Sequence, residues 1–340
     1  MRVVSLRILL TVCGALLATT AGSAYAAPPD PVMNSTTAGA AVARTKDGYA
    51  AVSAGRRINL ATSPTPSGTW TVQGTVLPDG PPDWITSLGS WAPELQRVGD
   101  SWVLYFSVLA TGMSSNQRCI GAATASEPTG PFTYVTRPLV CPENGAGDPV
   151  PGRPLKDAGA IDPSVYQARD GGLYLLYKTQ KLPATLRIVR LNSTGTQVRE
   201  GATSRELVQS KAIIEHPLLV KRGNRFVLFA SYRTYNTCKY RTIFMKARSI
   251  RAGAFQKAPR HELLTSRNTG VCGPGGADIA PTNRGPRIFF NGWVCKQTKP
   301  CPEGFNSHQA PDRGRRVMYV RRLTWRGSTP LRGSWVRPSP

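Results

Sequence analysis

The sequence has very little of what metal proteins and redox enzymes use as ligands. It contains three histidines in 340 residues, and it has no Cys-x-x-Cys pair, no His-Glu-x-x-His helix and no acidic calcium loop. These absences exclude the common zinc, calcium and dithiol sites. Acidic residues are also scarce, with 19 Asp and Glu against 43 Lys and Arg, for a formal net charge of +24.

Long apolar runs are missing except at the N-terminus. Arg2 and Arg7 give a basic start, Ile8–Ala18 is apolar, and Ala24-Tyr25-Ala26 is a small-x-small cleavage site. This order is typical of a secretory signal peptide and is too short for a membrane span. We therefore predict a signal peptide over residues 1–26 and a secreted mature chain, residues 27–340, that does not enter a membrane.

The cysteines agree with export. Cys13 leaves with the signal peptide, and an even number in an exported chain indicates disulfides rather than a metal site. Six cysteines allow fifteen pairings, and the simplest joins neighbours along the chain. The pairs predicted in this way are Cys119–Cys141, Cys238–Cys272 and Cys295–Cys301.

Helical periodicity is also scarce, and short stretches rich in Val, Ile, Tyr, Phe and Trp separated by turn residues dominate. Several segments share one form, in which a hairpin turn of Gly, Asp or Asn leads into an apolar strand. The segments are Gly39–Ser53, Trp91–Ser107, Asp162–Tyr177, His216–Ser231 and Ala277–Asn291. A third strand follows each hairpin, and a fourth often follows near an aromatic residue. Such repeats predict an all-β, five-bladed β-propeller with four antiparallel strands per blade, in one domain over residues 27–340. A β-sandwich with chance similarity is the alternative.

The innermost strands of a propeller begin at one mouth of its central channel. Asp162, Glu215, His216, Trp91 and Gly39 stand at the starts of the repeats, so we expect them to converge there. Cleavage of a glycosidic bond uses one carboxyl group as general acid and a second carboxylate as base. Two carboxylates beside an aromatic ring therefore predict a sugar-binding channel.

Five motifs occur in the same order across nearly the whole mature chain. They are Trp91-Ala-Pro-Glu-Leu95, Ile120–Ser126 followed by Gly130-Pro-Phe132, Ile161-Asp-Pro-Ser-Val165, Glu215-His-Pro-Leu218 and Val317–Trp325. Together they resemble glycoside hydrolase family 43, whose members are inverting enzymes that act on arabinans, arabinoxylans and xylo-oligosaccharides. The resemblance implies Glu215 as proton donor and Asp162 as the residue that tunes its pKa. Trp91 and His216, which the repeat starts bring to the same channel, are the expected substrate-binding residues.

Two positions depart from the family pattern. The repeat register puts Gly39 where family members carry the catalytic base, and Asp30 is the nearest upstream candidate for that role. Gly276 stands where members carry a histidine that organises an ion or water in the channel. These changes predict either a rearranged site that recruits Asp278 or Asp83, or a propeller that no longer cuts.

Two functions therefore stay open. One is a secreted hydrolase of α-L-arabinofuranosyl or xylosyl linkages, and the other is a non-catalytic carbohydrate-binding propeller that has lost the general base. We expect no cofactor, although a channel ion is an alternative. The expected partner is a pentose-containing polysaccharide or oligosaccharide. The basic charge fits a solvated surface or retention on an anionic polymer such as pectin or cell wall. Neither nucleic acid nor membrane is expected as a partner.

Overall fold

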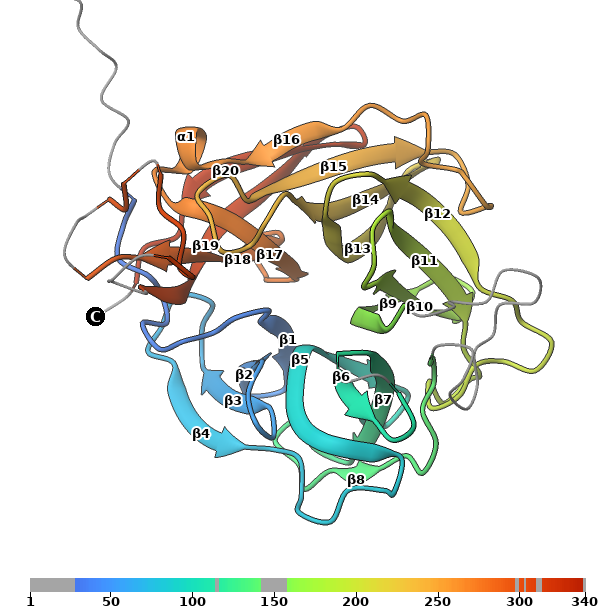
Figure 1. Cartoon of the computed structure of the whole chain (residues 1–340). Helices are drawn as coiled ribbons and strands as arrows, with labels where there is room; N and C mark the ends of the chain where they lie inside the picture. The colour runs from blue at the N-terminus through green and yellow to red at the C-terminus, as the bar shows by residue number, and fades with distance from the viewer. Residues whose placement is uncertain are drawn as a thin grey trace, which may run out of the picture.

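The structure is a computed structural model that describes residues 28–113, 116–141, 158–296, 300–302, 304–309 and 314–338. The predicted signal peptide, residues 1–26, lies outside the described residues. The described chain folds into five four-stranded antiparallel sheets that stand as blades around a central axis (Figure 1). This arrangement confirms the predicted five-bladed β-propeller. Among the described residues, no helix is long and apolar enough to span a bilayer.

Each blade is a meander of strands that follow one another in the sequence. Blade one contains β1 (Ala41–Thr45), β2 (Gly48–Ser53), β3 (Asn59–Ser63) and β4 (Thr71–Thr75). Blade two contains β5 (Ile85–Val98), β6 (Ser101–Ala110), β7 (Arg118–Ala125) and β8 (Thr133–Tyr134). Blade three contains β9 (Ala160–Gln167), β10 (Leu173–Thr179), β11 (Ala184–Arg190) and β12 (Arg205–Ser210).

The last two blades have the same form. Blade four contains β13 (Ile214–Arg222), β14 (Arg225–Tyr232), β15 (Arg241–Ala247) and β16 (His261–Leu264). Blade five contains β17 (Cys272–Ala280), β18 (Arg287–Val294), β19 (Arg315–Arg326) and β20 (Thr329–Trp335). One short helix, α1 (Ser266–Thr269), lies between these two blades. The hairpins turn at the glycines expected from the sequence, since Gly99 and Gly223 open two-residue loops with φ of 59° and 57°.

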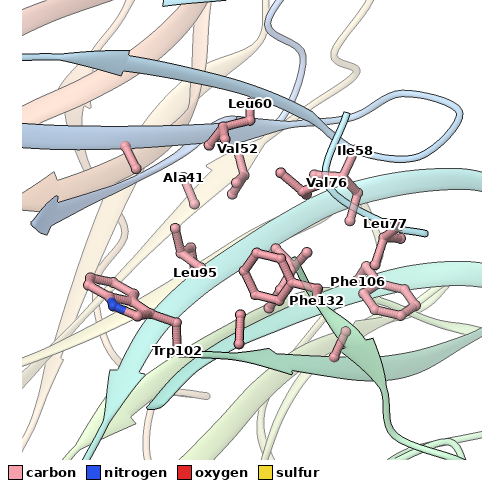
Figure 2. Packing of buried hydrophobic residues seen from close by; sticks show 14 of the residues in the cluster. Ala41, Val52, Ile58, Leu60, Val76, Leu77, Leu95, Trp102, Phe106 and Phe132 are labelled. Carbon is pink, nitrogen blue, oxygen red and sulfur yellow. The ribbon is translucent and has the colours of Figure 1, made fainter. Parts of the chain in front are cut away.

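The hydrophobic core is divided into layers that lie between neighbouring blades. Figure 2 shows the layer between blades one and two, where Val52 and Leu60 meet Leu95, Phe106 and residues around them. Similar clusters lie between blades two and three, three and four, four and five, and five and one. A single sheet cannot bury both of its faces, so each blade depends on its neighbours for stability.

The inner strands β1, β5, β9, β13 and β17 contact one another in turn around the axis. The strands β5, β9, β13 and β17 each carry one residue with φ between 39° and 61°, and such a residue also lies two positions before β1. These residues form what we call the channel ring: Gly39, Ala92, Asp162, His216 and Gly276. The left-handed conformation sets a bulge in the inner strands, which turns the residue before it toward the channel mouth.

The first and last blades close the circle through buried hydrogen bonds. Asn291 on β18 accepts the Ala40 backbone N–H at 3.3 Å and donates to the Thr37 hydroxyl at 2.9 Å. Asp278 on β17 accepts the Val42 N–H at 2.6 Å. The chain before β1 also pairs with β19 through a bridge between Met33 and Met318.

The predicted disulfide pairing is confirmed. Cys119–Cys141 lies within blade two, and Cys238–Cys272 joins the segment after β14 to β17, so it links blades four and five. Cys295–Cys301 closes a short loop after β18. These bonds hold the segments that surround the channel mouth.

We predict that Asn291→Ala destabilises the propeller by about 2 kcal/mol or more, because it leaves the buried Ala40 N–H without an acceptor. The matched control is Asn283→Ala, which removes an exposed contact with Arg44 across the same two blades. Its effect should stay below about 0.5 kcal/mol. Urea unfolding of both variants measures the difference, and equal losses would contradict a special role for Asn291 in closing the ring.

Candidate active site

Glu215 lies on β13 directly before the ring residue His216. Its side chain is 13% exposed and is held by two donors: Lys178 Nζ lies 2.8 Å from Oε2, and Tyr240 Oη lies 2.8 Å from Oε1. Burial alone would lower the pKa of Lys178, but the charges of Glu215 and Asp162 outweigh it and raise that pKa. The Lys178 ammonium therefore stays charged beside Glu215.

Asp162 occupies the channel ring on β9 and is buried. Its Oδ2 accepts the His216 backbone N–H at 3.0 Å, and its own N–H donates to Ser107 Oγ at 3.2 Å. Burial and the charge of Glu215 raise the pKa of Asp162 to about 6, against the opposing effects of Lys178 and the His216 N–H. Asp162 and Glu215 are thus close enough to influence each other, as the sequence predicted.

Tyr240 contacts Glu215 directly, and Arg316 contacts Tyr240. Burial and, to a smaller extent, the charge of Glu215 raise the pKa of Tyr240 well above its usual value. The phenol therefore stays protonated and donates a hydrogen bond to Glu215. The Arg316 guanidinium lies 5.2 Å from the Tyr240 ring and donates to the Tyr235 and Asn291 carbonyls. Sequence analysis missed Lys178, Tyr240 and Arg316. The clearest available sign was Lys178, a lysine that directly follows the apolar strand residues Leu173–Tyr177.

Trp91 stands in blade two at the position that Glu215 holds in blade four, since Trp91 pairs with Ser107 as Glu215 pairs with Ser231. Its side chain is 46% exposed, and the buried Arg118 guanidinium lies 3.7 Å from its ring centroid. An exposed aromatic face fixed at a channel mouth suits the apolar face of a sugar ring.

His216 is the channel-ring residue that directly follows Glu215 on β13. Burial lowers its pKa, while the charges of Asp278 and Glu215 act in the opposite direction. The imidazole is therefore neutral near neutral pH, and it lies among the channel carboxylates as expected.

The position predicted for the base holds no carboxylate. Gly39 is in the channel ring with φ of 59°, and a Cβ built on it would lie 3.1 Å from Ala92 Cα. Asp30 is exposed and lies beside β19. Burial and, to a smaller extent, the charge of Asp30 raise the pKa of Tyr319 on β19 to about 12. The structure therefore does not bring Asp30 together with Glu215, because β17 and β18 separate β19 from the channel.

The other two acids considered for this role are placed differently. Asp278 is buried, and its two oxygens accept the backbone N–H groups of Val42 and Ile279, so it ties blade five to blade one. Asp83 is exposed in the loop before β5. Glu94, two residues after Ala92 on β5, is a further channel carboxyl; burial and then Asp278 raise its pKa well above the usual value. Sequence analysis gave Glu94 no role.

Gly276 also leaves its ring position without a side chain, and its N–H donates to Ser231 Oγ at 2.8 Å. Within the described residues, no group of three or more His, Cys, Asp or Glu side chains is arranged to hold a metal ion. The channel therefore offers two adjacent carboxyl groups, a buried ammonium, a phenol and an exposed tryptophan.

Comparison with known proteins gives a consistent family. The sequence model of Glycosyl hydrolases family 43 matches residues 28–329. An Aspergillus terreus protein described as a probable arabinan endo-1,5-alpha-L-arabinosidase A is 27% identical over 289 residues, which cover 74% of this chain and 81% of that protein.

Shorter matches and solved structures agree. A probable arabinan endo-1,5-alpha-L-arabinosidase B of Aspergillus fumigatus is 29% identical over 133 residues, or 38% of this chain; the match spans only 34% of that protein's length. The structure of a Cellvibrio cellulosa alpha-L-arabinanase complexed with arabinohexaose superposes with a TM-score of 0.67. That match covers 87% of this chain and 95% of the arabinanase at 17% identity, which establishes a shared fold.

The raised pKa of Asp162 predicts a pH-dependent stability. Its pKa of about 6 in the folded protein lies above the usual aspartate value of 3.8. Stability should therefore fall as the pH rises from about 4 through about 6, because the charged carboxylate is disfavoured in the fold. Relative to Asp162→Asn, the wild type should lose on the order of 2–3 kcal/mol of unfolding free energy between pH 4 and pH 7.

Urea unfolding at both pH values measures this difference. Asp47→Asn, at an exposed position in the β1–β2 hairpin, is the matched control and should differ from wild type by the same amount at both pH values. A wild type that gained stability relative to Asp162→Asn over this range would contradict the assignment.

Proposed function

Since this chain belongs to Glycosyl hydrolases family 43, we propose that it is a secreted glycosidase that acts on α-L-arabinofuranosyl linkages of arabinan-type polysaccharide, with xylosyl linkages as the nearest related substrate. The observation that carries the proposal is the proximity of Glu215 and Asp162, which accepts the His216 N–H directly after Glu215, with the exposed Trp91 at the equivalent position of blade two. The arabinan-directed names of its relatives support the choice of sugar.

In this proposal Glu215 delivers a proton to the glycosidic oxygen, and Asp162 modulates that step. A water attacks the anomeric carbon from the opposite side with inversion and passes its proton to bulk solvent, because Gly39 offers no base. Trp91 and His216 contact the sugar. The proposed reaction needs no cofactor, because Glu215 and solvent water carry the proton transfers. Export follows from the N-terminal leader, and peptide sequencing of the secreted chain should find its first residue after Ala26.

A second function is favoured by two observations at the same site. Gly39 cannot accept a proton from the attacking water, and this loss alone lowers the rate by about 10²- to 10⁴-fold. Lys178 Nζ, 2.8 Å from Glu215 Oε2, and Tyr240 Oη, 2.8 Å from Oε1, each already contact an oxygen of the carboxyl group that would have to donate the proton. Both features suit a propeller that binds arabinan-type oligosaccharides in the channel and does not cut them.

Glu215→Gln separates the two functions. If the wild type hydrolyses linear α-1,5-arabino-oligosaccharides, the variant should lose at least about 100-fold of this activity and keep its affinity within a few-fold, because only the proton donor is removed. Proton NMR of the released sugar and calorimetric titration measure both quantities. Binding without turnover in wild type and variant would establish the second function, and absence of binding in both would contradict the two functions together.

Gly39→Asp tests the missing base. Asp162 shows that aspartate can adopt a ring conformation with φ of 56°. The new side chain needs room beside Ala92, so the substitution is best made together with Ala92→Gly. Turnover should rise by about 10- to 1,000-fold over the Ala92→Gly parent, within the range of general-base catalysis.

Gly39→Asn in the same background is the matched control, since it has the same size and no basic carboxylate. Asp30→Asn should leave turnover unchanged because Asp30 lies outside the channel. Equal turnover of the Gly39→Asp and Gly39→Asn proteins would show that the ring position does not determine catalysis.

A further inference from the structure

A second cavity lies beside the channel where blades four, five and one meet. Its volume is about 490 Å³, and its walls include Ala38, Tyr235, Trp293, His308, Arg315 and Arg316. Ala38 directly precedes the ring residue Gly39, and Arg316 stacks on the Tyr240 ring that holds Glu215. The cavity therefore adjoins the channel mouth, and its volume is in the range of small-molecule sites, about 300–1,000 Å³.

The two aromatic walls are held in place by hydrogen bonds. The Trp293 indole donates to the Tyr235 carbonyl at 2.8 Å, and Phe305 packs on the indole at 5.5 Å between centroids. Arg316 donates to the same carbonyl at 2.8 Å, and the Tyr235 hydroxyl and His308 Nε2 are 3.0 Å apart. Because these groups are already ordered, a ligand loses little of its binding energy in arranging them.

The segment that carries His308 is also tied down. The Cys295–Cys301 disulfide closes its first turn. Asn236 donates to the Asn306 side chain at 2.7 Å, and the Ser307 N–H donates to the Asn236 carbonyl at 2.9 Å. These bonds connect the segment after β18 to the segment after β14, so the two aromatic walls belong to one fixed surface.

Arginine charges gather at the cavity. Among the described residues that line it, Arg315 and Arg316 are cationic and none is an aspartate or glutamate. Arg316 is buried, and no carboxylate of the described chain lies within 4.0 Å of its guanidinium. Burial lowers the pKa of Arg316, against the smaller opposing effects of Tyr240, Glu215 and Tyr235, because a buried guanidinium without a directly paired carboxylate is costly. An anion in the cavity would offset this cost.

We propose that this cavity binds the carboxylate-bearing ring of an acidic oligosaccharide, a uronic acid. The exposed Tyr235 supplies a face for the sugar ring, and Trp293, which already contacts Arg316 and Phe305, forms the wall beside it. The exposed Arg315, fixed by its bonds to the Asn34 carbonyl and side chain, supplies the charge that meets the carboxylate. The neutral sugar in the channel and the acidic sugar in the cavity would then belong to one polymer of mixed composition.

Calorimetric titration of the full chain with α-1,4-digalacturonate tests the proposal. The wild type should bind this probe, and raising the salt concentration should weaken binding because opposite charges are screened. Arg315→Gln and Tyr235→Leu should each weaken it about tenfold, through loss of one charge-assisted contact or one aromatic face.

Arg199→Gln is the matched control, an exposed arginine on blade three. No binding of digalacturonate, or equal losses in Arg199→Gln and Arg315→Gln, would overturn the proposal, because general attraction to a basic protein would then explain the result. Neutral arabinotriose in the same titrations tests the channel separately. If arabinotriose neither binds nor is cut while digalacturonate still binds, the proposed function fails and the acidic-sugar site stands.

Discussion

The propeller depends on hydrogen bonds between blades, in which a side chain of one blade accepts a backbone N–H of the next. The side chain of Ser107 accepts the N–H of Asp162, and the side chain of Asp162 accepts the N–H of His216. In the same way, Ser231 accepts the N–H of Gly276, and Asn291 accepts the N–H of Ala40. These buried bonds fix the channel ring, and the ring fixes which side chains reach the channel. Architecture and candidate chemistry therefore share the same few residues.

Asp162 and Glu215 differ in how much the fold itself depends on them. Asp162 accepts a backbone N–H of the next blade, so the fold alone is a reason to keep it. Within the described chain, the Glu215 side chain is held by the side chains of Lys178 and Tyr240 and accepts no backbone N–H of a neighbouring blade. Its presence in a partly exposed channel position is therefore the stronger sign of a role toward a ligand. Gly39 and Gly276 adopt the left-handed conformation at no steric cost. The fold therefore needs no side chain at these two ring positions.

The blades and hairpin turns could be predicted from the sequence, because strand patterns and Gly-Asp or Gly-Asn turns are local signals. The disulfide pairs could be predicted because each cysteine pairs with its neighbour along the chain. Repeat alignment also placed Asp162, Glu215 and Trp91, since equivalent positions of equivalent blades must meet at the channel. Lys178, Tyr240 and Arg316 could not be placed in this way. Their roles come from contacts between different blades and loops, which no periodicity records. Asp30 was the candidate base because of its order along the chain, but it lies beside the outer strand β19.

The most direct test of the account is the position of a bound sugar, determined in a crystal of the Glu215→Gln protein soaked with a linear arabino-oligosaccharide. The account predicts an arabinose ring in the channel, stacked on the exposed face of Trp91, with a glycosidic oxygen within hydrogen-bond distance of residue 215. A sugar found only on the outer blades, with the channel holding none at saturating concentration, would contradict it.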